Sequence, residues 1–436
     1  MVEIGPIPVE KRTLGPIAFF FIWAGAGISL AEVLAGGFLA PVGLIAGIAA
    51  NMLGHLVGNT LFSMGGVIGT DHGIPSMVSV RASFGVRGSY LATVFNALQL
   101  VGWTAVMLVV AARSLDTISR EMLDLSNYPI WVVIIGTATT AWAWAGKEGW
   151  KWLQSVVSAL LLVICGYIGY IILSTVGLRG LLTVPRTGAM GFGLACDLVI
   201  AMPLSWLPLV ADYSRFGKST RGAFCGTWAG YFVSSSLMYT LGLAAALATG
   251  KADIIATLAA LGRGAAALFV VAFSTLTTAF LDVYSTAVSM QNLLPKLRER
   301  HLILAAGALG TLVALFFPIE RYENFLLFIG GVFVPLFGIV LADYFLLRRR
   351  KLATQDIFKR GGAYWYTSGV NLAAMVAWII GVLIYYICTR TSFWLGASIP
   401  SFLAASSLYL AEMALAAARE SRRTGKNQHT ERVDAR

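Results

Sequence analysis

Hydroxyl and carboxyl side chains recur along one apolar stretch, residues 264–290, at spacings that bring them to a single helical face. The stripe consists of Ser274, Thr278, Asp282, Ser285 and Ser289, with Thr277 beside it. Clustered oxygen ligands suit a hard monovalent cation. A single serine or threonine usually bonds to its own helix, but a carboxylate is costly to bury in an apolar segment. Asp282 is therefore a candidate functional residue.

A second polar stripe lies in the apolar stretch 89–113. It is formed by Asn96, Gln99, Trp103 and Met107, again at helical spacing. A glutamine amide offers a donor and an acceptor side by side, and a tryptophan offers a flat face. Trp206 follows Ser205 between two prolines and would supply an opposing wall. These residues predict a slot for a flat, hydrogen-bonding heterocycle, although tryptophans also pack in cores and interface belts.

Other polar groups fall inside apolar stretches. They are Glu32, Asp197, and the set Asn51, His55 and Asn59 on one helical face. We interpret the His55 face as interhelical hydrogen bonding rather than as a proton relay. For Glu32 and Asp197 a structural and a functional role both stay open. Asp343, next to the basic run RRRK, is predicted to form an interfacial ion pair.

The elements that position these residues follow from composition. The 436 residues are 58% hydrophobic and 12% charged, with a mean hydropathy of +0.77, which is too apolar for a water-facing surface. Runs of about 20 apolar residues span the ~30 Å hydrocarbon layer. The runs are roughly 16–40, 42–69, 89–113, 129–147, 152–174, 191–212, 222–249, 264–290, 302–318, 324–347, 364–389 and 394–418. We therefore predict an all-α integral membrane protein with about twelve transmembrane helices.

The formal charge of +11 is a topology signal. With both termini in the cytoplasm, most lysines and arginines fall in short cytoplasmic loops, including the run at 348–351, as the positive-inside rule requires. We expect a multi-pass protein of the cell membrane whose surroundings are the lipid bilayer, with no nucleic-acid partner. The four cysteines show no ligand-like spacing, so no cofactor and no metal other than a transported cation are expected.

Two of the apolar stretches contain residues that interrupt helices. WAGAGIS (23–29) has two mid-span glycines, and MPLSWLP (202–208) has two prolines. The two lie five spans apart, as two inverted five-helix repeats with a midplane site would give. The predicted organisation is a cytoplasmic N-terminus (1–15), a ten-helix core (16–347), a linker with two peripheral helices (348–418) and a cytoplasmic basic tail (419–436).

Several segments together carry a family resemblance. They are IPVEKRT (7–13), RASFGVRGS (81–89), GW (102–103), ADYSRFGK (211–218) and PLFGIVLADYFLLRRR (335–350). On these segments the chain resembles the nucleobase–cation symporter-1 family over nearly its whole length. Within that family, WAGAGISLAEVLAGGFLAP, MPLSWLPLVADYSRF and TTAFLDVYS look most like the CytX branch of hydroxymethylpyrimidine transporters.

The resemblance implies a fold like that of the leucine transporter: two inverted five-helix repeats with broken helices 1 and 6, plus two peripheral helices. It also implies a nucleobase-like ring stacked on Trp103, with Trp206 as the second wall. The cation site that it implies consists of Gly25, Ile28, Ser274, Thr277 and Thr278.

The chain departs from some branches of this family. Ala279 stands where cytosine-type members carry asparagine, and Met107 stands where some hydantoin-type members carry glutamine. The polar groups gained instead are Glu32, Asp282 and Asp197. A carboxyl group accepts from the exocyclic amine of an aminopyrimidine and, when protonated, donates to the adjacent ring nitrogen. This complementarity favours an aminopyrimidine over a uracil-like ring.

We therefore predict a symporter that imports a pyrimidine, such as the thiamine precursor hydroxymethylpyrimidine, with Na⁺ or H⁺. The predicted substrate contacts are Trp103, Trp206, Gln99, Asp282, Glu32, Ser205 and Asn96. The alternatives are a cytosine, purine or other nucleobase permease of the same family, a membrane-embedded enzyme, or a channel. Only His55 among the histidines lies well inside a span and no HExxH motif occurs, which disfavours an enzyme. The matched interruptions and the aromatic slot disfavour a channel.

Overall fold

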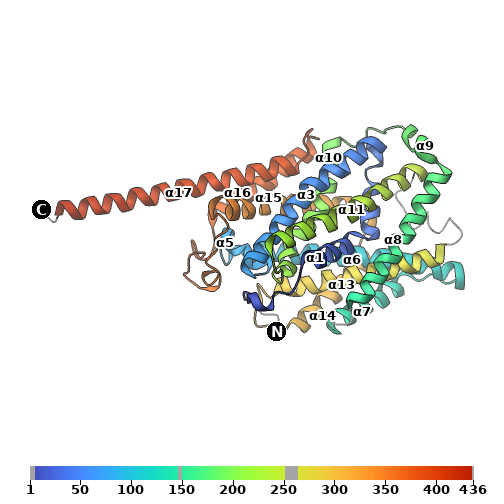
Figure 1. Ribbon diagram of the computed structural model, residues 1–436, viewed down its shortest axis with the longest axis horizontal. Coiled ribbons are helices and arrows are strands. Elements are labelled where there is room, and N and C mark those ends of the chain that lie inside the picture. Colours follow the sequence, from blue (N-terminus) through green and yellow to red (C-terminus); the bar gives the residue numbers. More distant parts are fainter. Residues whose placement is uncertain (1–4, 146–149, 251–263, 435–436) are drawn as a thin grey trace.

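The computed structural model describes residues 5–145, 150–250 and 264–434, without the side chains of some helical positions, among them Ser274 and Thr277. Long helices dominate this part of the chain (Figure 1). The first seven long elements are α1 (Pro16–Gly27), α2 (Leu30–Gly37), α3 (Leu44–His72), α6 (Gly88–Leu123), α7 (Tyr128–Ala145), α8 (Trp150–Thr175) and α10 (Phe192–Ser214). They are followed by α11 (Thr220–Thr249), α13 (Gly264–Met290), α14 (Glu299–Phe316), α15 (Tyr322–Ala342), α16 (Leu372–Arg390) and α17 (Ser398–Asp434). Each of the predicted apolar stretches contains one of these helices or the α1–α2 pair.

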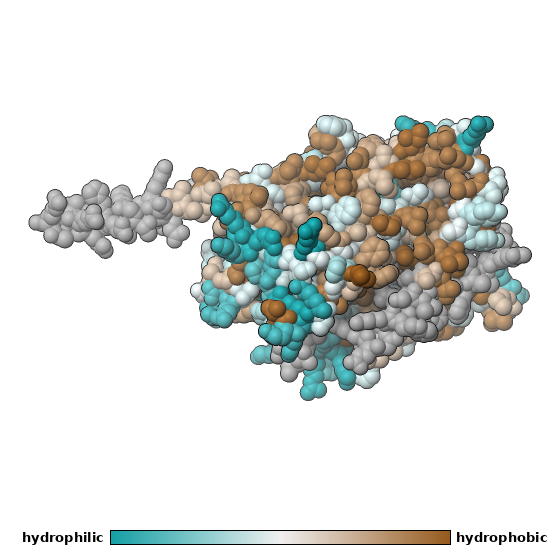
Figure 2. All heavy atoms as spheres, in the orientation of Figure 1, coloured by the Kyte–Doolittle hydropathy of each residue, from teal (hydrophilic) through white to brown (hydrophobic). Residues whose placement is uncertain are grey.

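The exterior of the molecule suits a bilayer. Among the described residues, eight helices are long and apolar enough to cross a membrane, and two bent helix pairs raise the number to ten. Figure 2 shows apolar side chains over much of the visible face of the body, with hydrophilic side chains gathered near α5 (Arg81–Phe84) and the N-terminus. An apolar exterior between polar ends is what a polytopic helical protein requires.

The first span is interrupted where the glycines predict it. α1 ends at Gly27 and α2 begins at Leu30, and the two parts of the span are bent by 57°. The Ser29 N–H donates to the Gly27 carbonyl at 3.1 Å, which releases the carbonyl of Gly25 from its usual helical donor. The Ser29 hydroxyl then caps α2. The interruption therefore frees a backbone carbonyl near the middle of the first span.

The interruption predicted in MPLSWLP is not present, because α10 continues through both of its prolines. Neighbouring segments satisfy backbone groups along this helix. The Gln99 amide of α6 donates to the Ser205 carbonyl at 2.9 Å, and the Ser76 hydroxyl accepts from the Ala211 N–H at 2.9 Å. Membrane helices tolerate proline where neighbouring helices surround and support the backbone.

The helices form three neighbouring groups. α3, α10 and α11 lie side by side, and α1 and α2 pack on α11 (Figure 1). α6 packs on α13, and α14 contacts both α6 and α7. α15, α16 and α17 pack together, and α17 projects beyond the body. The polar stripes of the sequence fall on α6 and α13, which face each other.

Segments that are distant in sequence but share basic residues meet at one end of the bundle, which we call the basic end. Arg12 donates to the Thr70 carbonyl at 2.6 Å, Arg81 donates to the Asn292 side chain at 2.9 Å, and Arg87 donates to the Ser368 carbonyl at 3.2 Å. The loops that the positive-inside rule assigns to one side therefore lie together. Their assignment to the cytoplasm stays a prediction.

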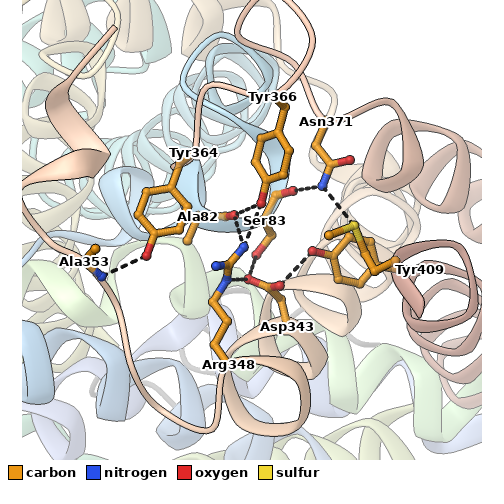
Figure 3. A network of polar contacts seen from close by, with 10 residues as sticks. Ala82, Ser83, Asp343, Arg348, Ala353, Tyr364, Tyr366, Asn371 and Tyr409 are labelled. Carbon is orange, nitrogen blue, oxygen red and sulfur yellow. Dashed lines mark hydrogen bonds and ion pairs between the residues drawn. The ribbon is translucent and has the colours of Figure 1, made fainter. Parts of the chain in front are cut away.

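Asp343 forms the ion pair that its position beside RRRK predicts (Figure 3). Its carboxylate accepts from Arg348 Nε at 2.6 Å, from Tyr409 at 2.7 Å and from Ser83 at 3.1 Å. Arg348 also donates to the Tyr366 hydroxyl at 2.7 Å. Burial raises the pKa of Tyr366 to about 12, so its phenol stays protonated at neutral pH. Burial lowers the pKa of Arg348, but the Asp343 carboxylate outweighs this effect and keeps it above its usual value.

The sequence predicts a span that begins at residue 364, but its helix, α16, begins later, at Leu372. Residues 364–371 form a loop instead. The Tyr366 hydroxyl donates to the Ala82 carbonyl at 2.6 Å, and the Asn371 amide donates to the Ser83 carbonyl at 2.7 Å (Figure 3). These bonds hold the loop against α5, which an apolar count cannot anticipate.

Candidate functional site

The two polar stripes face each other across the antiparallel pair α6 and α13. The Asn96 amide donates to the Ser289 hydroxyl at 2.7 Å, and the Asn292 amide donates to the Thr93 hydroxyl at 2.8 Å. Both bonds fit one antiparallel register. Seven residues after Asn96 on α6 and seven residues before Ser289 on α13, this register places Trp103 level with Asp282. All the described members of both stripes are buried.

The Gln99 amide connects α6 to α10. Its nitrogen donates to the Asn96 side chain at 2.8 Å and to the Ser205 carbonyl at 2.9 Å. Its oxygen is buried and has no hydrogen-bond partner among the described residues. The Ser205 hydroxyl is engaged by its own helix, since it donates to the Met202 carbonyl at 2.6 Å. Gln99 therefore has an acceptor available for a ligand.

The Gln99–Ser205 bond connects the two helices that carry the tryptophans predicted as walls. Gln99 lies one helical turn before Trp103 on α6, and Ser205 directly precedes Trp206 on α10. Trp206 donates to the Tyr231 hydroxyl at 2.9 Å. The indole N–H of Trp103 is buried without a partner among the described residues.

Trp23 is a further aromatic residue of this region that sequence reasoning did not place in the site. Its ring is edge-on to Trp206, with centroids 5.9 Å apart, and also contacts Phe62 and Tyr213. Its indole N–H is another buried donor without a partner in the described part of the chain. The available signal was its position at the start of WAGAGIS, directly before the interruption of the first span.

Asp282 is 2% exposed and carries an orphan acceptor. One of its carboxyl oxygens is buried without a hydrogen-bond partner among the residues that the structure describes. Tyr213 of α10 lies close to both Asp282 and Ser285. A polar side chain without a protein partner at this depth is costly unless water or a ligand engages it.

The structure places Glu32 behind Trp206. Its two carboxyl oxygens accept from the Tyr231 hydroxyl at 2.5 Å and lie 2.7 Å from the Ser235 hydroxyl. Because Tyr231 also accepts from Trp206, Glu32 is connected to the aromatic wall through one side chain. Sequence reasoning missed Tyr231 and Ser235, because their role depends on α11 packing against α2.

Asp197, whose role the sequence leaves undecided, and His55 both have hydrogen-bond partners. Asp197 accepts from the backbone N–H groups of Ala397 and Ser398 at 2.6 and 2.8 Å, which caps the start of α17. His55 connects α3 to α11, since its Nε2 lies 2.5 Å from the Ser235 hydroxyl. The interhelical hydrogen bond predicted for His55 is therefore present, and Asp197 caps α17.

The residues predicted to hold a cation are only partly described. Gly25 lies in α1, Ile28 lies in the break between α1 and α2, and Thr278 is buried on α13. The side chains of Ser274 and Thr277 lie outside the described residues. The released Gly25 carbonyl fits the role predicted for it, and the complete ligand set stays a prediction. In the described part of the chain, no group of three or more His, Cys, Asp or Glu side chains is arranged to hold a metal ion.

Long apolar helices, an interrupted first span and buried polar and aromatic side chains on α6, α10 and α13 are the features expected of a secondary membrane transporter. We use the name slot for the set Asn96, Gln99, Trp103, Trp206 and Asp282. A family described as permeases for cytosine/purines, uracil, thiamine and allantoin matches residues 6–411. The chain belongs to this family, and it is a transporter rather than an enzyme.

Individual relatives agree with this assignment. The chain is 28% identical to the cytosine permease of Escherichia coli (strain K12) over 356 residues, which cover 79% of this chain and 81% of that protein. It is 23% identical to the hydantoin permease of Microbacterium maritypicum over 421 residues, covering 90% and 85%.

Solved structures confirm the predicted fold. The inward-facing structure of Mhp1 matches with a TM-score of 0.86 at 22% identity, covering 96% of this chain and 94% of that one. A Na⁺-coupled sialic acid symporter matches with a TM-score of 0.64 at 13% identity, covering 92% and 88%. The all-α fold with leucine-transporter-like inverted repeats and about twelve transmembrane helices is therefore confirmed.

Proposed function

We propose that this chain imports an aminopyrimidine, such as the thiamine precursor hydroxymethylpyrimidine, across the cell membrane together with Na⁺ or H⁺. Membership of a permease family for nucleobase-type compounds supports the general class. The choice of an aminopyrimidine depends on the polar atoms between the helices of the slot.

The observation that carries this choice is a pair of buried acceptors that have no partner among the residues described by the structure. The Gln99 oxygen and one Asp282 oxygen belong to the facing stripes of α6 and α13. An exocyclic amine offers two hydrogens to such acceptors, and a protonated Asp282 would donate to the ring nitrogen beside the amine. A uracil-like ring presents a carbonyl at that position and would leave one acceptor unpaired.

Trp103 and Trp206 are the proposed stacking walls for this ring, and Trp23 closes the slot beside Trp206. Aromatic faces bind a planar heterocycle by stacking and exclude water from its hydrogen bonds. Alternating access follows when one helix bundle rocks against the other around this midplane site. If Na⁺ is the coupling ion, carbonyls at the α1–α2 break and the hydroxyl of Thr278 bind it.

Uptake by proteoliposomes tests this proposal. We expect radiolabelled hydroxymethylpyrimidine to accumulate under a Na⁺ or a pH gradient, each imposed separately. Trp103→Ala removes one stacking wall and should weaken binding by about 1–3 kcal/mol, the range seen when base–aromatic stacking is lost. Trp394→Ala is the matched control, since Trp394 is 73% exposed. Equal losses in both variants, or no gradient-dependent uptake by the parent protein, would contradict the proposal.

Cytosine is the second candidate substrate, because a relative named cytosine permease is 28% identical and cytosine also presents an amine beside a ring nitrogen. Ala279 disfavours it, since it offers no polar group there. Competition separates the two: the compound that displaces the tracer at the lower concentration is the better substrate. Inhibition by purines or allantoin alone would exclude both.

A further inference from the structure

A continuous chain of hydrogen bonds extends from the slot into the bundle. It comprises Trp206, Tyr231, Glu32, Ser235 and His55, and we call it the Glu32 chain. Its contacts are 2.9, 2.5, 2.7 and 2.5 Å long in that order. Every member is at most 6% exposed. Four elements contribute to it: α10, α11, α2 and α3.

Hydrogen counting fixes the direction of each bond. His55 Nδ1 lies 3.0 Å from the Asn51 carbonyl, which can only accept, so this nitrogen carries the hydrogen. In a neutral imidazole the other nitrogen then accepts, and the Ser235 hydroxyl donates to it. That hydroxyl has no second hydrogen for Glu32. The 2.7 Å contact between Ser235 and Glu32 therefore takes its hydrogen from Glu32.

Every hydrogen bond of the Glu32 chain can therefore form when the chain holds one titratable proton. With Glu32 ionised and His55 neutral, Ser235 would have one hydrogen for two acceptors. If the proton moves to His55, each hydrogen bond again has one hydrogen, but the ionised Glu32 and the charged His55 form a buried ion pair, which the low-dielectric interior disfavours. The proton accordingly belongs on Glu32, where the acid donates to Ser235 and accepts from Tyr231.

Among the residues that the structure describes, none offers a compensating charge for an ionised Glu32. The titratable groups of this part that face the chain are three tyrosines. They are Tyr231 itself, Tyr239 with its ring 5.1 Å from that of His55, and Tyr322, which donates to the Ala31 carbonyl at 3.3 Å. No lysine or arginine among the described residues forms an ion pair with Glu32. Loss of the proton is therefore costly until water reaches the chain, as it does when a transporter opens.

We propose that Glu32, together with Ser235 and His55, binds the proton whose movement drives transport. Trp206 connects this proton to the substrate, because the indole that stacks the ring also donates to Tyr231 at the end of the chain. A ligand that orders Trp206 stabilises the protonated chain, and by linkage the protonated chain favours the ligand. This inference rests on the proposed function, since it names the coupling ion of that transport.

Infrared spectroscopy of the purified, substrate-free protein tests the proton site directly. At neutral pH we expect a carboxylic-acid carbonyl band that disappears in Glu32→Gln. Ser235→Ala keeps the acid and should shift the band, because its acceptor is lost. Glu323→Gln is the matched control, since Glu323 lies partly exposed in the first turn of α15. A spectrum that Glu32→Gln leaves unchanged overturns the proposal.

Proteoliposomes test the coupling with radiolabelled hydroxymethylpyrimidine and a pH gradient. Glu32→Gln mimics the protonated acid but cannot release a proton. Its accumulation ratio should fall to about one, the value for an uncoupled carrier, while a measurable exchange of substrate between loaded vesicles and medium persists at a reduced rate. Retained pH-driven accumulation in this variant, or accumulation driven only by Na⁺ in the parent, overturns the proposal. If the parent moves no tracer, the proposed substrate fails, and the infrared band alone then decides the proton site.

Discussion

Asp282 differs from three other buried carboxylates, those of Asp197, Asp343 and Glu32. Asp197, Asp343 and Glu32 each have protein partners on both oxygens, whereas Asp282 keeps one oxygen without a partner among the described residues. A carboxylate that only stabilised helix packing would be expected to use both oxygens for that purpose. This oxygen is available for the substrate contact that we propose.

Asp282→Asn tests this contact. The amide presents the acceptor and donor of a protonated acid at every pH, so we expect the affinity for an aminopyrimidine to stay within about 1 kcal/mol of the parent value, without the loss of affinity that the parent protein shows when Asp282 ionises at high pH. Equilibrium binding of radiolabelled hydroxymethylpyrimidine at neutral and high pH measures the affinity and its pH dependence. Asp124→Asn is the control, because Asp124 is exposed and its left-handed backbone, φ 53°, suits asparagine. A loss of affinity at high pH that persists in Asp282→Asn would assign the aspartate a structural role.

The residues of the slot differ in how far the sequence could reveal them. Asn96, Gln99 and Asp282 lie on two helices, and helical spacing alone aligned each stripe. The partners of Glu32 could not be predicted, since Ser235 is 203 residues away and reaches it only through packing of α11 against α2. Periodicity within one segment carries no information about which face of another helix it will meet.

At the scale of elements, α3 and α10 approach closely because α3 presents glycines to α10. Gly54, Gly58 and Gly65 face Val199, Pro203 and Leu207 respectively. Small residues allow membrane helices to pack at short distance, where van der Waals contact replaces the missing hydrophobic effect. This packing also explains why the prolines of α10 do not break it, which the local sequence could not show.

Gly58→Ala tests this interface. A Cβ at Gly58 would clash with the ring of Pro203 and lie 3.2 Å from the Ile200 carbonyl, so the helices must separate. We expect a loss of roughly 1–3 kcal/mol, as for other overpacked positions. Thermal unfolding in detergent, followed by tryptophan fluorescence, measures it. Gly166→Ala on α8 is the control, because a Cβ there has no heavy atom within 4 Å. A comparable loss in both variants would exclude the packing explanation.

For the whole molecule, the number of spans and the grouping of the loops were predictable, since apolar length and positive charge are summed over many residues. The connections at the basic end were not. The Asp343–Arg348 pair at the end of the tenth predicted span binds the segment after the second span and the start of the eleventh, and Tyr409 adds α17 (Figure 3). One carboxylate thus fastens the peripheral helices to the core.

Asp343→Asn should therefore destabilise the assembled bundle rather than the slot. The amide replaces one acceptor by a donor facing Arg348 or Tyr409. Loss of one partner from a buried pair costs roughly 3–5 kcal/mol, and the 20% exposure of Arg348 places this site toward the lower value. Asp356→Asn is the matched control, because its pair with Lys359 is exposed and such pairs contribute about 0–1 kcal/mol. Thermal unfolding separates the two, and equal midpoints would show that the network does not fasten the peripheral helices.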